Sequence, residues 1–462
     1  MGGRILIGAP GSGSGKTLLV CGLLTALKKR GLSCRSYKCG PDYIDPMFHR
    51  SVLGIESGNL DSYFSTPEEI RKRVGKETAD CGMTVIEGVM GYYDGLGGNS
   101  VRASSYDIAS ITGTPAVLVI NGRGAGLSLA ALVKGFREFQ KDSRIEAVIV
   151  NRTSPMMAER LRGPIEETGA AFLGCLPELK DLHLESRHLG LVMPGEVKRL
   201  EESLERLAEE MERRLDLDRL LLLAEKCEEL SVYDAHMPGG QKTPGPKAAA
   251  GGERIPVGVA RDEAFCFYYG ENLRMLEKMG AELVEFSPLR DEKLPEGICG
   301  LILGGGYPEL HAGELEKNAS MRESVRRAAG RGLPVMAECG GFLYLKEQLE
   351  GADGKMYDMV GHLKGVSKNA GRLTRFGYLE LQGLPEGPVK GHEFHYWDCT
   401  ENGNFCRAVK PGNGRSWDCM ERSGAVTAGF PHLYYPSNPA VPEEFMRKCR
   451  TFRKENLTER NI

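Results

Sequence analysis

The chain has 462 residues, a formal net charge of −3 at pH 7 and 27% charged residues. This nearly balanced charge argues against the basic surfaces with which proteins bind nucleic acids or anionic membranes. No apolar run reaches membrane-spanning length, and no signal-peptide pattern precedes the first predicted strand. The 13 cysteines follow no Cys-x-x-Cys or zinc-binding spacing, which is typical of reduced thiols. We therefore expect a cytoplasmic protein without a nucleic-acid or membrane partner.

The first half of the chain alternates short β-rich runs with helical stretches. Strands are predicted at residues 4–8, 34–38, 84–87, 116–120, 147–151 and 171–176, and helices at 17–30, 127–140 and 156–168. This alternation predicts an α/β fold in which a mostly parallel sheet carries helices on both faces. Residues 196–230 are rich in Glu, Arg and Leu at helical spacing and predict a solvated helix on the same domain, with a coiled-coil helix as the alternative.

A segment rich in glycine, proline and lysine separates the two halves, between residues 237 and 252. The α/β rhythm then restarts, with strands predicted at 255–260, 282–286, 301–303 and 334–337, and helices at 268–279 and 310–329. A chain of this length exceeds one ordinary core. We therefore predict a first domain over residues 1–235, a linker over 236–254 and a second α/β domain over 255–462.

Glycines cluster between the first predicted strand and the first predicted helix, in Gly8-Ala-Pro-Gly-Ser-Gly-Ser-Gly-Lys-Thr17. Here Gly13 and Gly15 allow backbone N–H groups to close around phosphate oxygens. Lys16 can reach the outer phosphates, and the Thr17 hydroxyl can ligate Mg²⁺. Pro10 stands where the strict motif has glycine, so this is a variant loop. A flexible glycine turn is the alternative, but the position at a helix start favours a nucleotide site.

Two further segments place acids at strand ends on the same edge of the predicted sheet. Asp42 and Asp45 follow the strand predicted at residues 34–38 within one irregular turn, where carboxylates can hold Mg²⁺ or water around a nucleotide. Glu87 ends another apolar strand, in a position resembling that of a Walker-B acid. A lone acid at such a place is usually a solvated loop residue. Because this loop lies at the same sheet edge as the glycine loop and the loop with Asp42 and Asp45, we expect Glu87 to belong to the nucleotide site.

Cys339 lies in Leu333-Pro-Val-Met-Ala-Glu-Cys-Gly-Gly-Phe342, where a predicted buried strand runs directly into a cysteine and two glycines. The amphipathic segment 342–349 follows and predicts a helix. A nucleophile on such a tight turn is exposed above the sheet, close to backbone N–H groups that can receive an oxyanion. We expect the helix N-terminus to favour the thiolate. A buried structural cysteine is the alternative.

Several segments together resemble one family: Gly13-Ser-Gly-Lys-Thr17, 38–46, Glu87-Gly-Val-Met-Gly91 with Asp94, Arg187-His-Leu-Gly-Leu191, Ala264-Phe265 with Phe267-Tyr-Tyr269, Phe286-Ser-Pro288, Gly304-Gly-Gly-Tyr-Pro-Glu309, 337–341 and 391–396. They resemble the cobyrinate a,c-diamide synthases of the corrinoid pathway, nearly end to end. The segments 38–46 and 187–191 are the most specific, because they separate this family from cobyric acid synthases and partitioning ATPases. The resemblance implies an ATP-binding, dethiobiotin-synthetase-like amidoligase domain followed by a class I-like glutamine amidotransferase domain.

The activity that this resemblance implies is a ligase reaction. ATP would phosphorylate the a and c acetate carboxylates of cobyrinic acid, and ammonia from L-glutamine would then displace phosphate. Metal-free hydrogenobyrinic acid and nickel-sirohydrochlorin are the alternative substrates. In the second domain Cys339 would attack the glutamine amide while His432 shuttles the proton.

The resemblance also assigns roles to the polar residues of the first domain. ATP would be bound by Gly13, Gly15, Lys16 and Thr17; phosphoryl transfer and substrate would involve Lys38, Asp42, Asp45 and Asp94; Mg²⁺ would be held by Thr17, Glu87 and Asp45. These assignments are expectations carried over from the matching motifs.

The chain departs from the family pattern in several places. Asn121 stands where aspartate is usual, and Trp397 stands where a small hydroxyl residue is usual. His432-Leu-Tyr-Tyr435 stands where the family usually has His-Leu-His-Phe. The usual third member of the glutaminase site, a glutamate two residues after the histidine, is absent, because that position is Tyr434. We therefore predict a Cys–His pair whose orienting acid, if any, comes from elsewhere. The segment 391–396 is a candidate docking surface between the domains, and the alternative is that its histidines line the glutaminase core.

Other classes of protein would use only part of these features. A ParA-like ATPase would share the phosphate loop but has no use for Cys339. A peptidase-like cysteine hydrolase would share the nucleophile turn but has no use for Lys16. A scaffold built from two degenerate domains would need neither residue. The presence of both sites in one chain favours the amidotransferase.

Overall fold

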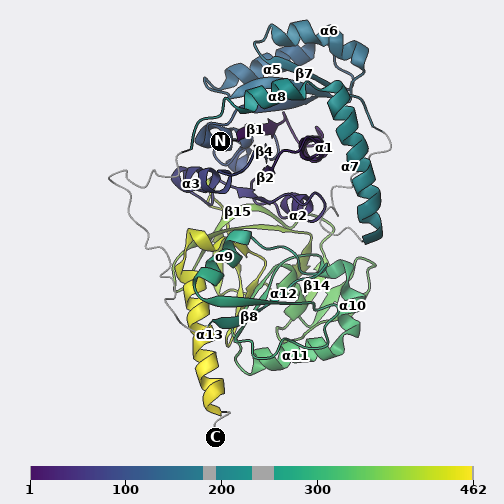
Figure 1. Ribbon diagram of the computed structural model, residues 1–462. Helices are drawn as coiled ribbons and strands as arrows, with labels where there is room; N and C mark the ends of the chain where they lie inside the picture. The colour runs from purple at the N-terminus through teal and green to yellow at the C-terminus, as the bar shows by residue number, and fades with distance from the viewer. Residues whose placement is uncertain (1, 180–193, 231–253, 460–462) are drawn as a thin grey trace, which may run out of the picture. The chain divides into compact units, whose positions relative to one another are not determined.

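The computed structural model describes residues 2–179, 194–230 and 254–459, which belong to two compact units, Met1–Gly239 and Gly240–Ile462 (Figure 1). The boundary between the units falls inside the range proposed as a linker, 236–254, of which only Arg254 is described. The motif at 187–191 also lies outside the described residues. Within the described ranges, no helix is long and apolar enough to cross a membrane.

The first unit is built on a seven-stranded, entirely parallel sheet in the order β3-β2-β4-β1-β5-β6-β7. Its strands are β1 (Gly3–Gly8), β2 (Cys34–Cys39), β3 (Ser57–Leu60), β4 (Met83–Glu87), β5 (Ala116–Asn121), β6 (Ile145–Asn151) and β7 (Ala171–Leu176). Its helices are α1 (Lys16–Lys29), α2 (Ile44–Ser51), α3 (Pro67–Glu77), η1 (Leu96–Gly98), α4 (Ser105–Thr112), α5 (Ser128–Phe139), α6 (Pro155–Glu166), α7 (Pro194–Arg214) and α8 (Leu217–Ala224).

Helices cover both faces of this sheet because its strands are apolar on both sides. Successive residues of a strand point to opposite faces. Ile5 and Ile7 accordingly pack in one buried cluster with residues of α1, α2, α7 and α8, while Leu6 packs in another with residues of α3–α6. Helices α1 and α7 lie side by side on the first of these faces (Figure 1). The predicted α/β sheet with helices on both faces is confirmed.

Two elements of the first unit differ from the prediction. Strand β3 was not predicted, since its sequence Ser-Gly-Asn-Leu lacks an apolar run and its position depends on pairing with β2. The single helix predicted over 196–230 is instead two helices, α7 and α8. The chain breaks at Leu215–Asp216, where Asp216 donates its N–H to Leu173 O and its side chain caps α8 by accepting from Arg219 N.

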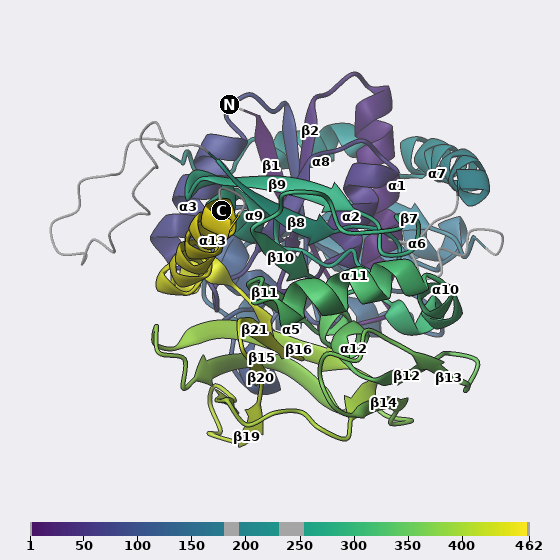
Figure 2. The same ribbon diagram turned by 90° about the horizontal axis from the view of Figure 1, so that it is seen from below.

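The second unit contains three sheets. A six-stranded sheet has the order β20-β21-β11-β10-β8-β9 and is parallel except for β20, as Figure 2 shows for β9, β8, β10 and β11. Its strands are β8 (Ile255–Ala260), β9 (Ala281–Phe286), β10 (Gly300–Leu303), β11 (Val335–Glu338), β20 (Glu421–Ser423) and β21 (Val426–Gly429). The helices of this unit are α9 (Gly270–Lys278), η2 (Pro308–Leu310), α10 (Ala312–Lys317), α11 (Ala319–Gly330), α12 (Gly340–Leu345), η3 (Tyr435–Ser437) and α13 (Ala440–Glu459).

The other two sheets are formed by residues 348–433, in which no strand was predicted. A five-stranded antiparallel sheet contains β15 (Arg375–Gln382), β16 (Val389–His395), β18 (Cys406–Val409), β19 (Ser416–Cys419) and β22 (His432–Leu433). A four-stranded mixed sheet contains β12 (Gln348–Glu350), β13 (Met356–Asp358), β14 (Val366–Asn369) and β17 (Trp397–Cys399). Residues of α9 and α13 share one buried cluster with β15 and β16, whereas α10–α12 pack on the opposite face of the six-stranded sheet.

Two predicted helices of the second unit are shorter than expected. The helix predicted over 310–329 is divided at Asn318, whose side chain caps α11 by accepting a hydrogen bond from Met321 N. The segment 342–349 is helical only as far as Leu345, because residues 348–350 pair with β13 and β14 as strand β12.

Candidate active sites

The glycine loop of the first unit lies between β1 and α1, as predicted. Gly13 and Gly15 adopt positive φ angles of 76° and 89°, which favour glycine. A Cβ atom at Gly15 would lie 2.3 Å from Asn151 Nδ2. That amide donates to Ser14 O at 2.9 Å, so the end of β6 braces the loop from a distant part of the chain. Asn151 was not singled out in the sequence, and its position at a strand end was the available signal.

Lys16 is the first residue of α1 and is 8% exposed. Its Nζ donates to Met90 O at 2.6 Å and to Gly11 O at 3.2 Å. Burial, together with the neighbouring Lys38 ammonium, lowers the pKa of Lys16 to about 8. The ammonium is therefore held at the loop by backbone carbonyls, in a place where phosphate oxygens would be better partners.

A cluster of the buried Lys38, Asp45 and Glu87 with the half-buried Thr17 lies beside this loop. Glu87 Oε1 accepts from Thr17 Oγ1 at 2.6 Å and from Lys38 Nζ at 2.7 Å, and Lys38 also pairs with Asp45. The strand order explains the meeting, because β4 lies between β1 and β2 and Lys38 is opposite Glu87 in the register. Three segments that are far apart in the sequence thus converge at one sheet edge.

The ionisation of this cluster reflects burial and mutual charge. Burial and the Asp45 carboxylate raise the pKa of Glu87 to about 7. Burial alone would raise the pKa of Asp45, but the Lys38 ammonium outweighs it and the pKa is lowered. Burial would also lower the pKa of Lys38, yet its two carboxylate partners hold it well above its ordinary value.

The donor atoms of this cluster fit a magnesium ion. Glu87 Oε2 is buried and makes no hydrogen bond within the described parts of the chain, and the Thr17 hydroxyl lies against the same carboxylate. Oxygen donors of this kind, completed by phosphate and water, are what Mg²⁺ prefers. Among the described residues, no group of three or more His, Cys, Asp or Glu side chains could hold a metal ion by itself. Phosphate oxygens and water would therefore have to complete the ligands of the magnesium ion.

Asp42 and Asp94 have local partners that the sequence did not indicate. Asp42 Oδ1 accepts from the N–H groups of Ile44 and Asp45 at 2.8 and 3.1 Å, so it closes the first turn of α2. Burial, followed by the charge of Asp45, raises the pKa of Asp42 to about 6. Asp94 Oδ2 accepts from Gly91 N at 3.0 Å and stabilises the turn after β4. Both acids border the cluster, and both shape its loops.

His49 is a further buried residue of this site that received no role from the sequence. Its Nε2 lies 3.9 Å from Glu87 Oε2, and its Nδ1 lies 3.0 Å from Ser36 Oγ. Burial lowers the pKa of His49 to about 4, so the ring is neutral near pH 7. Its position four residues after Asp45, on the same face of α2, was the available signal.

The second candidate site is centred on Cys339. This residue joins β11 to α12 with φ 46° and ψ −103°, a strained conformation for a residue other than glycine, and its N–H donates to Gly429 O at 2.8 Å. A Cβ atom at Gly341 would lie 2.2 Å from Leu303 O, so the second glycine permits the close approach of β10. The predicted strand-to-helix turn is present.

The N–H of Gly340, the first residue of α12, favours the Cys339 thiolate as expected, but burial outweighs it. The helix α12 is only six residues long, and Cys339 is 8% exposed. Burial, followed by the carboxylates of Glu309 and Glu393, raises the pKa of the Cys339 thiol above its ordinary value. A partner that takes the proton is therefore needed.

His432 lies on β22 next to β16, with His392 opposite it in the register. Its ring stacks on His392 with centroids 4.9 Å apart and planes at 17°. A Cβ atom at Gly305 would lie 2.4 Å from His432 Cε1, so the glycine loop after β10 fits against the ring edge. Since the Cys339 turn packs on the same loop, with Gly341 N donating to Gly304 O at 2.9 Å, one loop lies against both candidate catalytic residues.

An acid that the sequence did not identify lies beside His432. Glu338 Oε2 is 3.6 Å from His432 Nδ1, and Glu338 Oε1 accepts from Leu433 N at 3.3 Å. Glu338 directly precedes Cys339, and this adjacency was the available signal.

His392 and His395 of segment 391–396 are buried, whereas Phe394 and Tyr396 are exposed, so the docking role of the segment stays a prediction. The ring of His395 stacks on Phe430 with centroids 3.8 Å apart, and His392 Nδ1 lies 3.0 Å from Tyr269 Oη. Burial, followed by His432, holds the pKa of His392 well below its ordinary value. These histidines line the core around the candidate glutaminase site, which was the alternative.

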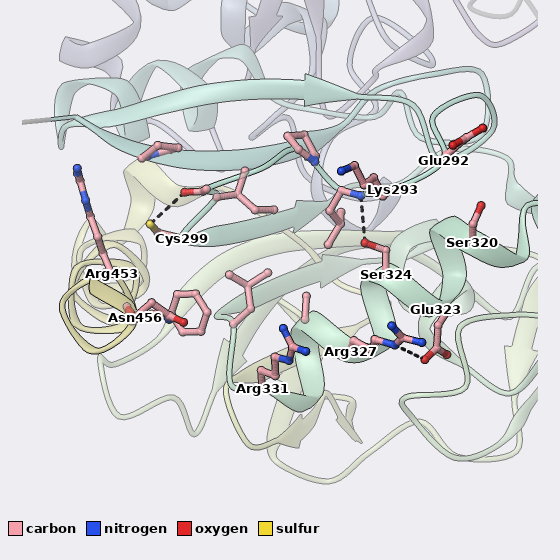
Figure 3. Close-up of a pocket in the computed structure, with 18 residues that line it drawn as sticks. Glu292, Lys293, Cys299, Ser320, Glu323, Ser324, Arg327, Arg331, Arg453 and Asn456 are labelled. Atoms are coloured by element: carbon pink, nitrogen blue, oxygen red, sulfur yellow. Dashed lines mark hydrogen bonds and ion pairs between the residues drawn. The ribbon is translucent and has the colours of Figure 1, made fainter. Parts of the chain in front are cut away.

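A cavity of about 820 Å³ opens elsewhere on the second unit, with Lys293, Ser324 and Arg331 in its lining (Figure 3). The lining also includes Cys299 and Leu333, which precede β10 and β11. The cavity therefore lies at the amino ends of the parallel strands, whereas Cys339 follows the carboxyl end of β11. It is not part of the Cys339 site.

Family models match both halves of the chain. Residues 5–192 match the CobQ/CobB/MinD/ParA nucleotide binding domain, and residues 256–439 match the CobB/CobQ-like glutamine amidotransferase domain. These ranges contain the phosphate loop and the Cys339 turn, respectively.

Curated relatives match almost the whole chain. A cobyrinate a,c-diamide synthase of Listeria innocua serovar 6a is 39% identical over 95% of this chain and 97% of its own length. Those of Syntrophotalea carbinolica and Salmonella typhimurium are each 37% identical, over 97% and 96% of this chain and 98% of their own lengths. With the phosphate loop, the acid cluster and the cysteine turn all in place, the chain belongs to the cobyrinate a,c-diamide synthase family.

Proposed function

We propose that the protein uses ATP and glutamine to amidate the a and c acetate carboxylates of cobyrinic acid. The observation that carries this proposal is the presence, in one chain, of a phosphate loop bonded to buried acids and of a cysteine turn with a histidine. The amidation of a carboxylate needs both, because the acid must be activated and ammonia must be supplied.

In the first unit, the N–H groups around Gly13 and Gly15 bind the ATP phosphates, and Lys16 exchanges its carbonyl partners for the outer phosphates. Thr17, Glu87 and Asp45 would hold Mg²⁺, which neutralises charge on the transferring phosphoryl group when bound. Lys38 keeps Glu87 and Asp45 together, and Asp42 and Asp94 hold the loops that face the substrate. The substrate carboxylate attacks the γ-phosphorus, and the product is an acyl phosphate and ADP.

In the second unit, His432 accepts the thiol proton while Cys339 Sγ attacks the side-chain amide carbon of glutamine. The N–H groups next to Cys339 receive the developing oxyanion. His432 returns the proton to the leaving nitrogen, which departs as ammonia, and water then hydrolyses the thioester to glutamate. Ammonia attacks the acyl phosphate, and phosphate leaves.

The test is incubation of the full chain with ATP, Mg²⁺ and glutamine, in parallel with cobyrinic acid, hydrogenobyrinic acid and nickel-sirohydrochlorin. Mass spectrometry counts the carboxyl-to-amide conversions, and ADP and glutamate are measured alongside. We expect a diamide of cobyrinic acid with matched release of ADP and glutamate. Amidation of only one of the other tetrapyrroles would reassign the substrate, and no amide from any of them would refute the proposal.

A further inference from the structure

We propose that Glu338 is the positioning acid for His432, in place of the glutamate that glutaminase sites of this type usually have two residues after the histidine. This inference rests on the proposed glutaminase reaction of Cys339 and His432. It extends that reaction by naming the group that orients the proton carrier.

The two oxygens of the Glu338 carboxylate hold two consecutive residues. Oε2 lies 3.6 Å from His432 Nδ1, and Oε1 accepts from Leu433 N at 3.3 Å. A carboxylate that lies close to the ring and accepts from the following peptide restrains the rotation of the ring as well as the position of β22. Glu338 is also the last residue of β11, so the acid and the nucleophile are joined through one peptide bond.

The surroundings of His432 make this orientation specific. One face of the ring lies against His392, and the Cε1 edge lies against Gly305. With Nδ1 directed at Glu338, the opposite nitrogen, Nε2, is the one left to exchange a proton with Cys339. Asp–His pairs in other nucleophilic triads work in this way, by holding one tautomer and stabilising the imidazolium.

Other acids near Cys339 have different partners. Glu393 Oε2 lies 3.5 Å from His395 Nε2, and its Oε1 accepts from Trp417 Nε1 at 3.3 Å. Glu309 belongs to η2 and has no ion pair with His432 within the described residues. Two further titratable groups near the pair, among the described residues, are His392, which burial keeps neutral, and Tyr435, whose pKa burial holds well above its ordinary value.

The charge of Glu338 acts on Cys339 in two opposite directions, and this provides a sharp test. Acting directly, the carboxylate disfavours the thiolate. Acting through His432, it stabilises the imidazolium and thereby favours the ion pair of thiolate and imidazolium. Replacing the carboxylate by a neutral amide therefore accelerates alkylation of Cys339 in the first case and slows it in the second.

The experiment compares wild type with Glu338→Gln, Glu338→Asp and Glu393→Gln. Glu393 is the matched control, because it is a buried glutamate that pairs with another histidine, His395. Alkylation of Cys339 by iodoacetamide is followed from pH 6 to 10 by mass spectrometry of the Cys339 peptide, because the chain has 13 cysteines. Glutamine hydrolysis is measured alongside, and amidation driven by ammonia reports that the fold is intact.

For Glu338→Gln we expect slower alkylation of Cys339 near neutral pH, with its pH profile displaced upward, and kcat for glutamine hydrolysis lowered by about 10²–10⁴-fold. KM for glutamine should change by less than about threefold, since the acid does not touch the substrate. Glu338→Asp should recover part of the loss, and Glu393→Gln should not slow alkylation.

Alkylation of Glu338→Gln that is as fast as wild type or faster would overturn the inference, as would unchanged kcat. Cys339→Ser separates this result from a failure of the proposed function. If Cys339→Ser still hydrolyses glutamine, the proposed reaction itself is wrong. If it does not, and Glu338→Gln behaves like wild type, only the role of Glu338 is refuted.

Discussion

Lys38 Nζ donates to Glu87 Oε1 at 2.7 Å across adjacent strands, and the same ammonium pairs with Asp45. In the structure described, the lysine pairs with both carboxylates that we propose as magnesium ligands. Nucleotide and metal must therefore share these acids with Lys38. Substitution of any one of these three residues should therefore disturb the proposed phosphoryl-transfer site.

Glu87→Gln keeps the shape of the side chain but removes its charge. We expect amidation to fall by about 10²-fold or more with either glutamine or ammonia as nitrogen source, because activation of the carboxylate precedes both. Basal glutamine hydrolysis at Cys339 should persist. Measuring diamide, ADP and glutamate in the same samples checks this, and loss of all three activities in folded protein would indicate one shared site.

Cys339→Ser should abolish glutamine-dependent amidation and leave amidation at high ammonia close to wild type, because the two units carry separate chemistry. His432→Ala should give the same pattern. The measurement is the rate of amide formation with each nitrogen source. Equal loss of both rates for Cys339→Ser would mean that the cysteine supports the fold or that the two-site assignment is wrong.

Nucleotide binding should weaken above about pH 8. The pKa of Lys16 is lowered to about 8 in the free protein, and bound phosphates favour its protonated form. Below this pH Lys16 is protonated both before and after binding, so its ionisation does not make the affinity for nucleotide depend on pH. Above it, binding takes up a proton, and the dissociation constant should rise towards about tenfold per pH unit.

Isothermal titration calorimetry in two buffers of different ionisation enthalpy measures that proton uptake directly. Lys16→Arg is the matched control, because its guanidinium stays charged throughout this range and should bind nucleotide without the alkaline fall. An alkaline fall of the same size in Lys16→Arg would assign the titration to another group.

Gly15→Ala and Gly11→Ala test the shape of the phosphate loop. Gly15 has φ 89°, and an added Cβ atom would lie 2.3 Å from Asn151 Nδ2, whereas a Cβ atom at Gly11 meets no atom within 4 Å. Left-handed strain alone costs about 1–2 kcal/mol, so Gly15→Ala should weaken nucleotide binding by about tenfold or more. Gly11→Ala should stay close to wild type. Equal effects in titrations with nucleotide would contradict this account.

Glutamine hydrolysis should be faster when ATP and the tetrapyrrole are both bound, because ammonia released without an acceptor is lost as ammonium. A coupling of about 1–3 kcal/mol is typical of linked sites. Glutamate release with and without ATP and cobyrinic acid measures it. A rate indifferent to both ligands would leave the two units as independent enzymes.

The local pattern of residues predicted every strand of the first sheet except β3, the glycine loop before α1 and the cysteine turn after β11. These features follow from short-range periodicity and from the conformations that glycine permits, so they can be inferred from neighbouring residues alone. The family motifs likewise located Lys16, Thr17, Glu87, Cys339 and His432.

Only the tertiary structure decided which distant groups act together. The pairing of β3 with β2 and the break between α7 and α8 depend on contacts with other strands. The bracing of the phosphate loop by Asn151 and the approach of Glu338 to His432 depend on strand register and on packing across the sheet. The raised pKa of Cys339 follows from burial, which no local pattern specifies. The sequence therefore located the groups proposed as reactive, and long-range packing selected their partners and their ionisation.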